Sequence, residues 1–337
     1  MKIAILGRTG LLFKTMNLLA KRGHTIVLVG TCKAAPEYEV TEADFERYAK
    51  ENDIPFFCNA NLRDGAVAAM LWDSQADVAI SVNWMNIIVE ESIKCFKYGI
   101  LNAHAGDLPR YRGNACPNWA MILGEKQLAV SVHFMEANKL DSGDILVKKY
   151  LPISEHTKIG EIYTWLGEVI PSMFAEAVSG LEAGTIIPKK QSQDRNTWLR
   201  VYPRKPSDSL IDWSKGAVVI ERLINASSEP FSGAYTYYGM KKVIVWRAHA
   251  GEWDCPSVAV HGSVIKRDAA SGAVAIACGD GVIWLDEIAL EGKRQRPYDV
   301  IKSMRDRLGM NIEDEIYRVN CRLARLEQQM NLEIGVE

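Results

Sequence analysis

The sequence of 337 residues lacks any uninterrupted apolar run close to the ~20 residues that a membrane-spanning helix needs. It also lacks a charge excess, because 40 Lys and Arg oppose 42 Asp and Glu, and this argues against nucleic acid or a membrane surface as the main partner. Its seven cysteines form no C-x-x-C pair, and its six histidines show no metal-ligand spacing. We therefore expect a cytoplasmic protein with reduced thiols, no metal and no membrane contact.

One familiar cofactor motif is incomplete, and one familiar catalytic motif is absent. Gly7 and Gly10 stand in "ILGRTGLL", but the third glycine of the dinucleotide fingerprint is missing, and no acidic residue ends the apolar run at "VLVGTCK". A structural turn is the favoured interpretation of this segment. The chain contains no G-x-S-x-G motif, so covalent acyl chemistry through a serine nucleophile is not supported.

What the first ~150 residues do contain is an alternation of short apolar runs with helical patterns. Runs at 2–6, 25–30, 77–82 and 99–103 predict βαβ units and a Rossmann-like, doubly wound, mostly parallel sheet in an α/β domain spanning 1–190. The stretch 191–206 has few core-forming runs and is expected to be a linker. From 207 to 300, short β-branched and aromatic runs separated by Gly and Asp predict a small OB-like β-barrel.

The segment 301–337 predicts a helical tail. Its apolar residues recur at intervals of four and three: Ile312, Ile316, Val319, Leu323, Leu326 and Met330. Two interpretations remain open for this stripe. It packs onto the barrel domain, or it forms a short coiled-coil contact in a homodimer.

Asn102 and His104 end the apolar run that begins at Ile100. Alternate residues of a strand point to the same side, and ligands of doubly wound sheets bind beyond the carboxyl ends of the strands. A structural hydrogen-bonded pair and half of an active site both explain this placement. Asp141, in a loop after the run "LAVSVHFM", adds a carboxylate. An amide, an imidazole and a carboxylate together can stabilise an oxyanion and move protons.

At these residues the sequence resembles a known family. "NAHAGDLPRYRG", with "LDSGDI" placing Asp141 39 residues after Asn102, resembles the 10-formyltetrahydrofolate-dependent formyltransferases. "YPRKPSDSLIDW", "EPFSGAY" and "ACGDGVIWLDEI" resemble the C-terminal barrel of methionyl-tRNA formyltransferases and of the enzyme that formylates UDP-4-amino-arabinose. Where the family commonly has Ser-Leu-Leu-Pro, this chain has Gly106-Asp107-Leu108-Pro109.

The resemblance implies roles for individual residues. Asn102 would donate an N–H to the developing oxyanion, His104 would stabilise it and shuttle protons, and Asp141 would orient His104. The co-substrate N10-formyltetrahydrofolate would contact Met85, Asn86, Ile87 and Ile88, then Gly106, Leu108, Pro109, Ala137, Lys139 and Leu140. The amine substrate would contact Arg112, Asn114, Asn118 and Trp119. Trp119 is most simply explained as a packing residue at a helix start, with a contact to the substrate as the second interpretation. Arg112 is equally explained as a solvated loop residue.

The charge distribution bears on which amine is formylated. Residues 31–53 contain three basic and seven acidic side chains, and residues 207–300 contain ten basic and twelve acidic ones, so neither segment favours RNA. "YRGNACPNWAMILGE" also resembles sugar-nucleotide formyltransferases more than tRNA-modifying ones. We therefore predict N-formylation of a nucleotide-linked amino sugar in surface-polysaccharide synthesis. The alternatives are formylation of initiator methionyl-tRNA, hydrolysis of 10-formyltetrahydrofolate, and a binding module that has lost catalysis.

Overall fold

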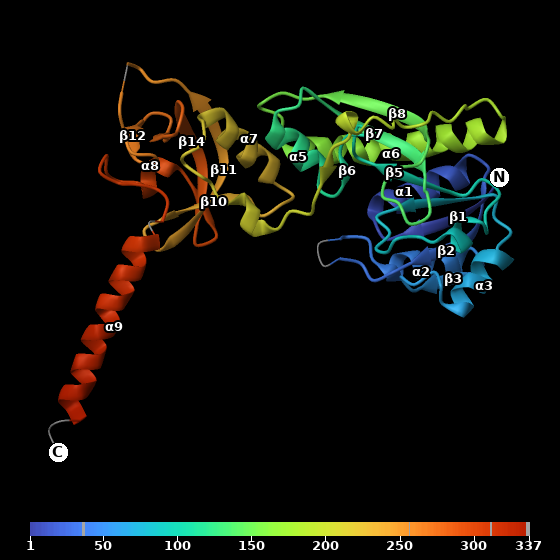
Figure 1. The fold of residues 1–337 in the computed structure, drawn as a ribbon, viewed down its shortest axis with the longest axis horizontal. Helices are drawn as coiled ribbons and strands as arrows, with labels where there is room; N and C mark the ends of the chain where they lie inside the picture. The colour runs from blue at the N-terminus through green and yellow to red at the C-terminus, as the bar shows by residue number, and fades with distance from the viewer. Residues whose placement is uncertain (36–37, 256, 311, 335–337) are drawn as a thin grey trace. The chain divides into compact units, whose positions relative to one another are not determined.

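The computed structural model describes residues 1–35, 38–255, 257–310 and 312–334. The chain divides into two compact units, residues 1–204 and 205–337 (Figure 1). Within the described ranges, no helix is both long and apolar enough to cross a membrane. The same ranges contain no group of three or more His, Cys, Asp or Glu side chains placed to hold a metal ion.

The first unit contains a seven-stranded sheet in the order β3-β2-β1-β4-β5-β7-β8. Its strands are β1 (Lys2–Gly7), β2 (Thr25–Thr31), β3 (Phe56–Cys58), β4 (Val78–Val82), β5 (Ile100–His104), β7 (Gln127–Phe134) and β8 (Ile145–Pro152). β3, β2, β1, β4 and β5 are parallel. β7 is antiparallel to β5, and β8 is antiparallel to β7, so β8 runs in the same direction as the five parallel strands. The predicted α/β class with a mostly parallel, doubly wound sheet is confirmed.

Helices flank this sheet, and both of its faces are buried. They are α1 (Gly10–Lys21), α2 (Glu42–Glu51), α3 (Gly65–Asp73), α4 (Glu90–Ile93), α5 (Cys116–Leu123) and α6 (Ile159–Glu182). Ala4 and Leu6 of β1 share a core with α3 residues such as Leu71, while Ile3 and Ile5, which point the other way, are also fully buried. A polar side chain of this sheet can therefore meet a ligand only near a strand end.

Residues 191–204, expected as part of a linker, belong to the first unit. Gln191 is buried. The short strand β9 (Arg200–Val201) pairs with β6 (Arg112–Gly113), and the 3-10 turn η1 (Arg195–Thr197) lies between. The segment has few apolar residues because its contacts are backbone pairing and polar side-chain bonds. Neither kind of contact produces a periodic pattern of apolar residues that could be recognised in the sequence.

The second unit is an antiparallel sheet domain, as predicted. After the 3-10 turn η2 (Pro206–Ser209), it contains α7 (Ala217–Ser227), β10 (Ala234–Tyr238), β11 (Lys241–Gly251), β12 (Val264–Arg267), β13 (Val274–Ala277), β14 (Val282–Leu290), β15 (Lys293–Gln295) and α8 (Pro297–Val300). The sheet order is β10-β11-β14-β13-β12, with β15 on β14. Residues 306–309 hydrogen-bond both to β10 and to the start of β12, so this segment connects the two end strands into a barrel-like arrangement.

The tail forms the predicted helix, α9 (Ile312–Ile334). Its apolar stripe does not pack onto the barrel domain, because the six side chains from Ile312 to Met330 are between 51% and 65% exposed. The interpretation that the stripe packs onto the barrel domain is therefore not supported, and the coiled-coil contact in a homodimer remains a prediction.

Candidate active site

The carboxyl end of β5 carries Asn102, and the antiparallel register sets it opposite His133 of β7. The Nδ1 of His133 lies 2.7 Å from the carbonyl oxygen of Phe134 and donates to it. Its Nε2 is then free to accept from the Asn102 side-chain amide, whose Nδ2 lies 3.2 Å away. His133 thereby fixes the orientation of the Asn102 amide, which keeps a second N–H for a ligand. The sequence did not indicate His133 as a site residue.

His104 is buried next to the same strand end, with 8% of its surface exposed. Its Nε2 donates to the carbonyl oxygen of Tyr111 at 2.5 Å, with the Cys116 Sγ 3.5 Å away, and its Nδ1 lies 3.6 Å from an Asp141 oxygen. Burial alone would lower the pKa of His104. The Asp141 carboxylate, the Cys116 thiol and the Tyr111 carbonyl oxygen outweigh burial and raise this pKa to about 9. The imidazole is therefore a cation at neutral pH.

His133 has the opposite electrostatic environment, although its Nε2 is only 3.8 Å from the other Asp141 oxygen. Burial lowers the pKa of His133, the Asp141 carboxylate partly opposes this, and the nearby His104 cation lowers the pKa further. The two rings are edge-to-face, with centroids 6.4 Å apart. The Asp141 carboxylate therefore stabilises the charged form of His104. His133 stays neutral, mainly because burial disfavours a charge on it and in addition because the adjacent His104 is already a cation.

Asp141 is held by a backbone N–H and by a side-chain amide, both from distant parts of the chain. The Gly113 N–H donates to its Oδ2 at 3.0 Å. The Gln191 Nε2 donates to the Asp141 carbonyl oxygen at 2.9 Å and to the Gly143 carbonyl oxygen at 2.8 Å. These bonds keep Asp141 in the left-handed region, at φ 48°, which non-glycine residues seldom adopt. The structure thus brings the three predicted catalytic residues together.

A cavity of about 350 Å³ opens beside these side chains. Its lining includes Asn102, His104 and Asp141 together with seven other predicted site residues: Met85, Asn86, Ile87, Ile88, Asn114, Lys139 and Leu140. Leu11 and Ile170 contribute apolar walls. Trp84 also lines the cavity, and its indole N–H is buried without a hydrogen-bond partner among the described residues.

The remaining predicted residues lie outside that lining. Leu108 and Asn118 are buried, Ala137 is half-buried, and Pro109 follows a cis peptide bond. Trp119 donates from its indole nitrogen to the Tyr202 carbonyl oxygen at 2.8 Å, which matches a packing role. Gly106 lies against the His104 imidazole, and a Cβ there would approach the Tyr111 carbonyl oxygen to 2.6 Å and the His104 Nε2 to 2.7 Å.

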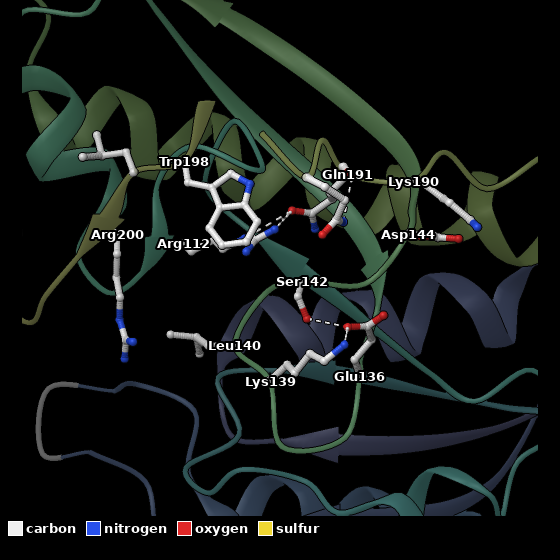
Figure 2. Close-up of a pocket in the computed structure, with 12 residues that line it drawn as sticks. Arg112, Glu136, Lys139, Leu140, Ser142, Asp144, Lys190, Gln191, Trp198 and Arg200 are labelled. Carbon is white, nitrogen blue, oxygen red and sulfur yellow. Dashed lines mark hydrogen bonds and ion pairs between the residues drawn. The ribbon is translucent and has the colours of Figure 1, made fainter. Parts of the chain in front are cut away.

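A second cavity, of about 610 Å³, contains Arg112 in its wall (Figure 2). The Arg112 Nη2 donates to the Gln191 Oε1 at 2.6 Å, and its guanidinium carbon lies 4.5 Å from the centre of the Trp198 ring. Glu136, Lys139 and Leu140 line both cavities. The two cavities therefore adjoin along the loop that ends at Asp141.

Comparison with known proteins identifies the family. Residues 1–178 match the formyl transferase family, and residues 204–304 match the formyl transferase C-terminal domain. The chain belongs to the formyl transferase family. The resemblance noted from "NAHAGDLPRYRG" and "LDSGDI" is thereby confirmed, and a formyl-transferring enzyme is the function that the family supports.

Relatives differ in the substrates that their names state. A methionyl-tRNA formyltransferase of Coxiella burnetii is 29% identical over 301 residues, covering 87% of this chain and 92% of that protein. The N-formyltransferase of Helicobacter canadensis, solved with folinic acid and dTDP-3-aminofucose, superposes with a TM-score of 0.60 at 15% identity, covering 85% of this chain and 99% of that one. HypX of Aquifex aeolicus, solved with tetrahydrofolic acid, gives a TM-score of 0.58 at 19% identity and covers 90% of this chain. This chain spans about half of HypX, 47% of its length. The two structural likenesses show the fold alone.

Proposed function

We propose that this protein transfers the formyl group of N10-formyltetrahydrofolate to the amine of a nucleotide-linked amino sugar. The observation that carries the proposal is the convergence of the Asn102 amide, the His104 cation and the Asp141 carboxylate on one cavity. The apolar walls of this cavity, and the buried Trp84 N–H that lacks a partner among the described residues, suit a flat heterocycle with hydrogen-bonding edges such as the pterin of a folate. The folate supplies a formyl group already activated for transfer.

The side chains have complementary tasks in this chemistry. An alkyl amine has a pKa near ~10 and must lose a proton before or during its attack on the formyl carbon. The Asp141 carboxylate can accept that proton and return it to N10 of the folate when the bond between N10 and the formyl carbon breaks and tetrahydrofolate leaves. The Asn102 N–H and the His104 cation supply hydrogen bonding and positive charge to an oxygen that becomes negative. The neutral His133 keeps the amide of Asn102 in a donating orientation.

Two observations favour a small amine over a tRNA. Acidic side chains exceed basic ones in residues 31–53 and in residues 207–300, and such surfaces repel a phosphate backbone. The Helicobacter canadensis protein, whose fold this chain shares, was solved with an amino sugar linked to dTDP. Initiator methionyl-tRNA is the second candidate, because the Coxiella burnetii relative is named for that substrate.

The test follows the release of tetrahydrofolate from 10-formyltetrahydrofolate. The wild-type protein is incubated with the folate alone, with UDP-, dTDP- and GDP-linked amino sugars, and with initiator methionyl-tRNA. Release that requires one of the nucleotide sugars, with the formylated sugar detected by mass spectrometry, is the expected result. Release with methionyl-tRNA only would establish the second candidate, and release without any amine would establish a hydrolase.

A further inference from the structure

The cavity that adjoins the catalytic one carries uncompensated positive charge. Figure 2 shows Lys139 and Ser142 directed at the Glu136 carboxylate, with distances of 3.0 and 2.8 Å, so this acidic side chain is already satisfied. Lys190 and Arg200 make no ion pair with any residue that the structure describes. Together with Arg112, they leave an excess of cations in the wall over the single remaining carboxylate, that of Asp144.

The most buried of these cations is rigidly placed. Arg112 directs its Nη2 and Nε at the Gln191 Oε1, at 2.6 and 3.3 Å, and it stacks on the Trp198 ring. Its bonding partner Gln191 is neutral, and the Asp141 and Glu136 carboxylates act on Arg112 without an ion pair to it among the described residues, so the guanidinium can still pair with an anionic ligand. Because the amide nitrogen of Gln191 also holds the Asp141 loop, an anion bound at Arg112 has a fixed position relative to the catalytic carboxylate.

We propose that this second cavity binds the diphosphate of the nucleotide-linked sugar, with Arg112, Lys190 and Arg200 contacting the phosphate oxygens. This assignment rests on the proposed function. The indole of Trp198 supplies an aromatic wall for the base. Since Glu136, Lys139 and Leu140 line both cavities, a sugar attached to a diphosphate in the larger cavity reaches the smaller one, where Asp141 lies.

The carboxylates of the folate's glutamate tail are a second possible source of anions for this cavity. The KM values for the nucleotide sugar and for the folate distinguish this source from the diphosphate. Lys190→Ala and Arg200→Ala are each expected to raise the KM for the nucleotide sugar by about tenfold, the usual consequence of losing a charge-assisted hydrogen bond. The kcat and the KM for 10-formyltetrahydrofolate should stay within about twofold. Lys126→Ala is the matched control, because this lysine pairs with Glu155 at the surface and lines neither cavity.

Direct binding separates this inference from the proposed function. UDP and dTDP are titrated calorimetrically into the wild-type protein and the three variants, with no reaction required. We expect binding to wild type and the control, and about tenfold weaker binding to Lys190→Ala and Arg200→Ala. No binding to wild type, equal binding to all variants, or a raised KM for the folate in place of the sugar would overturn the assignment. Failure of every nucleotide sugar as a substrate would instead overturn the proposed function.

A separate observation concerns α9. The exposed stripe occupies the two inward positions of a heptad repeat, with Ile316, Leu323 and Met330 at a and Ile312, Val319 and Leu326 at d. In a parallel pair of such helices, Arg322 at a g position faces Glu327 at an e position of the second copy. In an antiparallel pair, Arg322 faces Arg322 and Glu313 faces Glu327. We infer that α9 forms a parallel two-stranded coiled coil with a second copy of this chain.

Light scattering after size exclusion tests this inference on the full chain. The wild-type protein is expected to be a dimer. The variant that combines Leu323→Glu with Leu326→Glu is expected to be a monomer, and the control Gln328→Glu, on the outer face of the repeat, is expected to be a dimer.

Cross-linking tests the orientation of the two helices. Leu326→Cys, in a chain with Cys321→Ser, should cross-link on oxidation, because only a parallel pair brings the two substituted positions together; an antiparallel pair would separate them by about 15 Å. A monomeric wild type, a dimer that survives the double substitution, or absence of the cross-link would overturn the inference.

Discussion

Replacing Asp141 by asparagine should change the charge of His104, and the pH dependence of the reaction should report it. The substitution keeps the size of the side chain and an oxygen that can accept from the Gly113 N–H. We therefore expect the loop to keep its conformation. The Asp141→Asn substitution removes the negative charge that lies 3.6 Å from the His104 Nδ1. Without that charge, burial is the dominant influence on the pKa of His104, and it acts downward.

The magnitude follows from the distance. Two unit charges 3.6 Å apart interact by about 5 kcal/mol at an effective dielectric constant near ~20. This energy corresponds to a change of about 3 in pKa, which would bring the pKa of His104 from about 9 to about 6. At pH 8 the wild-type imidazole is then largely protonated, whereas about one molecule in a hundred of the Asp141→Asn variant carries the proton.

The assay is kcat for tetrahydrofolate release between pH 6 and pH 9, with NMR titration of the His104 imidazole alongside. Loss of the proton acceptor lowers the rate of Asp141→Asn at every pH. In addition, the ratio of variant to wild-type kcat should fall about 10²-fold from pH 6 to pH 9, because the variant loses nearly all of its His104 charge in that interval whereas the wild type loses about half. Asp73→Asn, an exposed carboxylate at the end of α3, should give a flat ratio near one. A flat ratio in Asp141→Asn, with an unchanged His104 titration, would refute the reasoning.

Four other changes test the site. Asn102→Ala should lower kcat by ~10²-fold or more through loss of an oxyanion donor; a rate near that of wild type would contradict its assignment. His133→Phe removes the acceptor that orients the Asn102 amide and should lower kcat about tenfold while the KM for the folate is unchanged, which steady-state kinetics can separate. Gly106→Ser places a Cβ 2.7 Å from the His104 Nε2 and should cost about 1–3 kcal/mol in urea unfolding. The raised pKa of His104 stabilises the folded state below pH 6.5, and this contribution, about 3 kcal/mol, is lost as the pH rises from 6.5 to about 9. The unfolding free energy of His104→Asn should lack that decline.

Much of the catalytic unit could be predicted because its signals are local. Apolar runs separated by helical patterns identified the strands, and the period of two placed Asn102 and His104 on one side of β5. Asp141, which lies 39 residues after Asn102, was added to the predicted site because the family motif has this spacing. The segment 191–204 escaped prediction, because it is held by polar bonds such as those of Gln191 and by the pairing of β9 with β6. Such contacts depend on residues far away in the sequence.

His133 shows the same limit within the site itself. Its neighbours in "LAVSVHFM" identify a buried strand, and a histidine there has no local feature that marks it as functional. Only the register of β5 against β7 places it opposite Asn102. The same applies to Trp119, for which sequence left packing and substrate contact open, and whose bond to the Tyr202 carbonyl oxygen now favours packing.

By itself, the sequence determined the class of fold, the family and the identity of an amide, an imidazole and a carboxylate at one sheet edge, because strand period and motif spacing are properties of the chain. The tertiary structure alone decided which histidine is charged. His104 and His133 both lie within 4 Å of Asp141, but a pKa depends on burial, nearby charges and hydrogen bonds together. Folding supplies those surroundings from segments that are distant in the sequence.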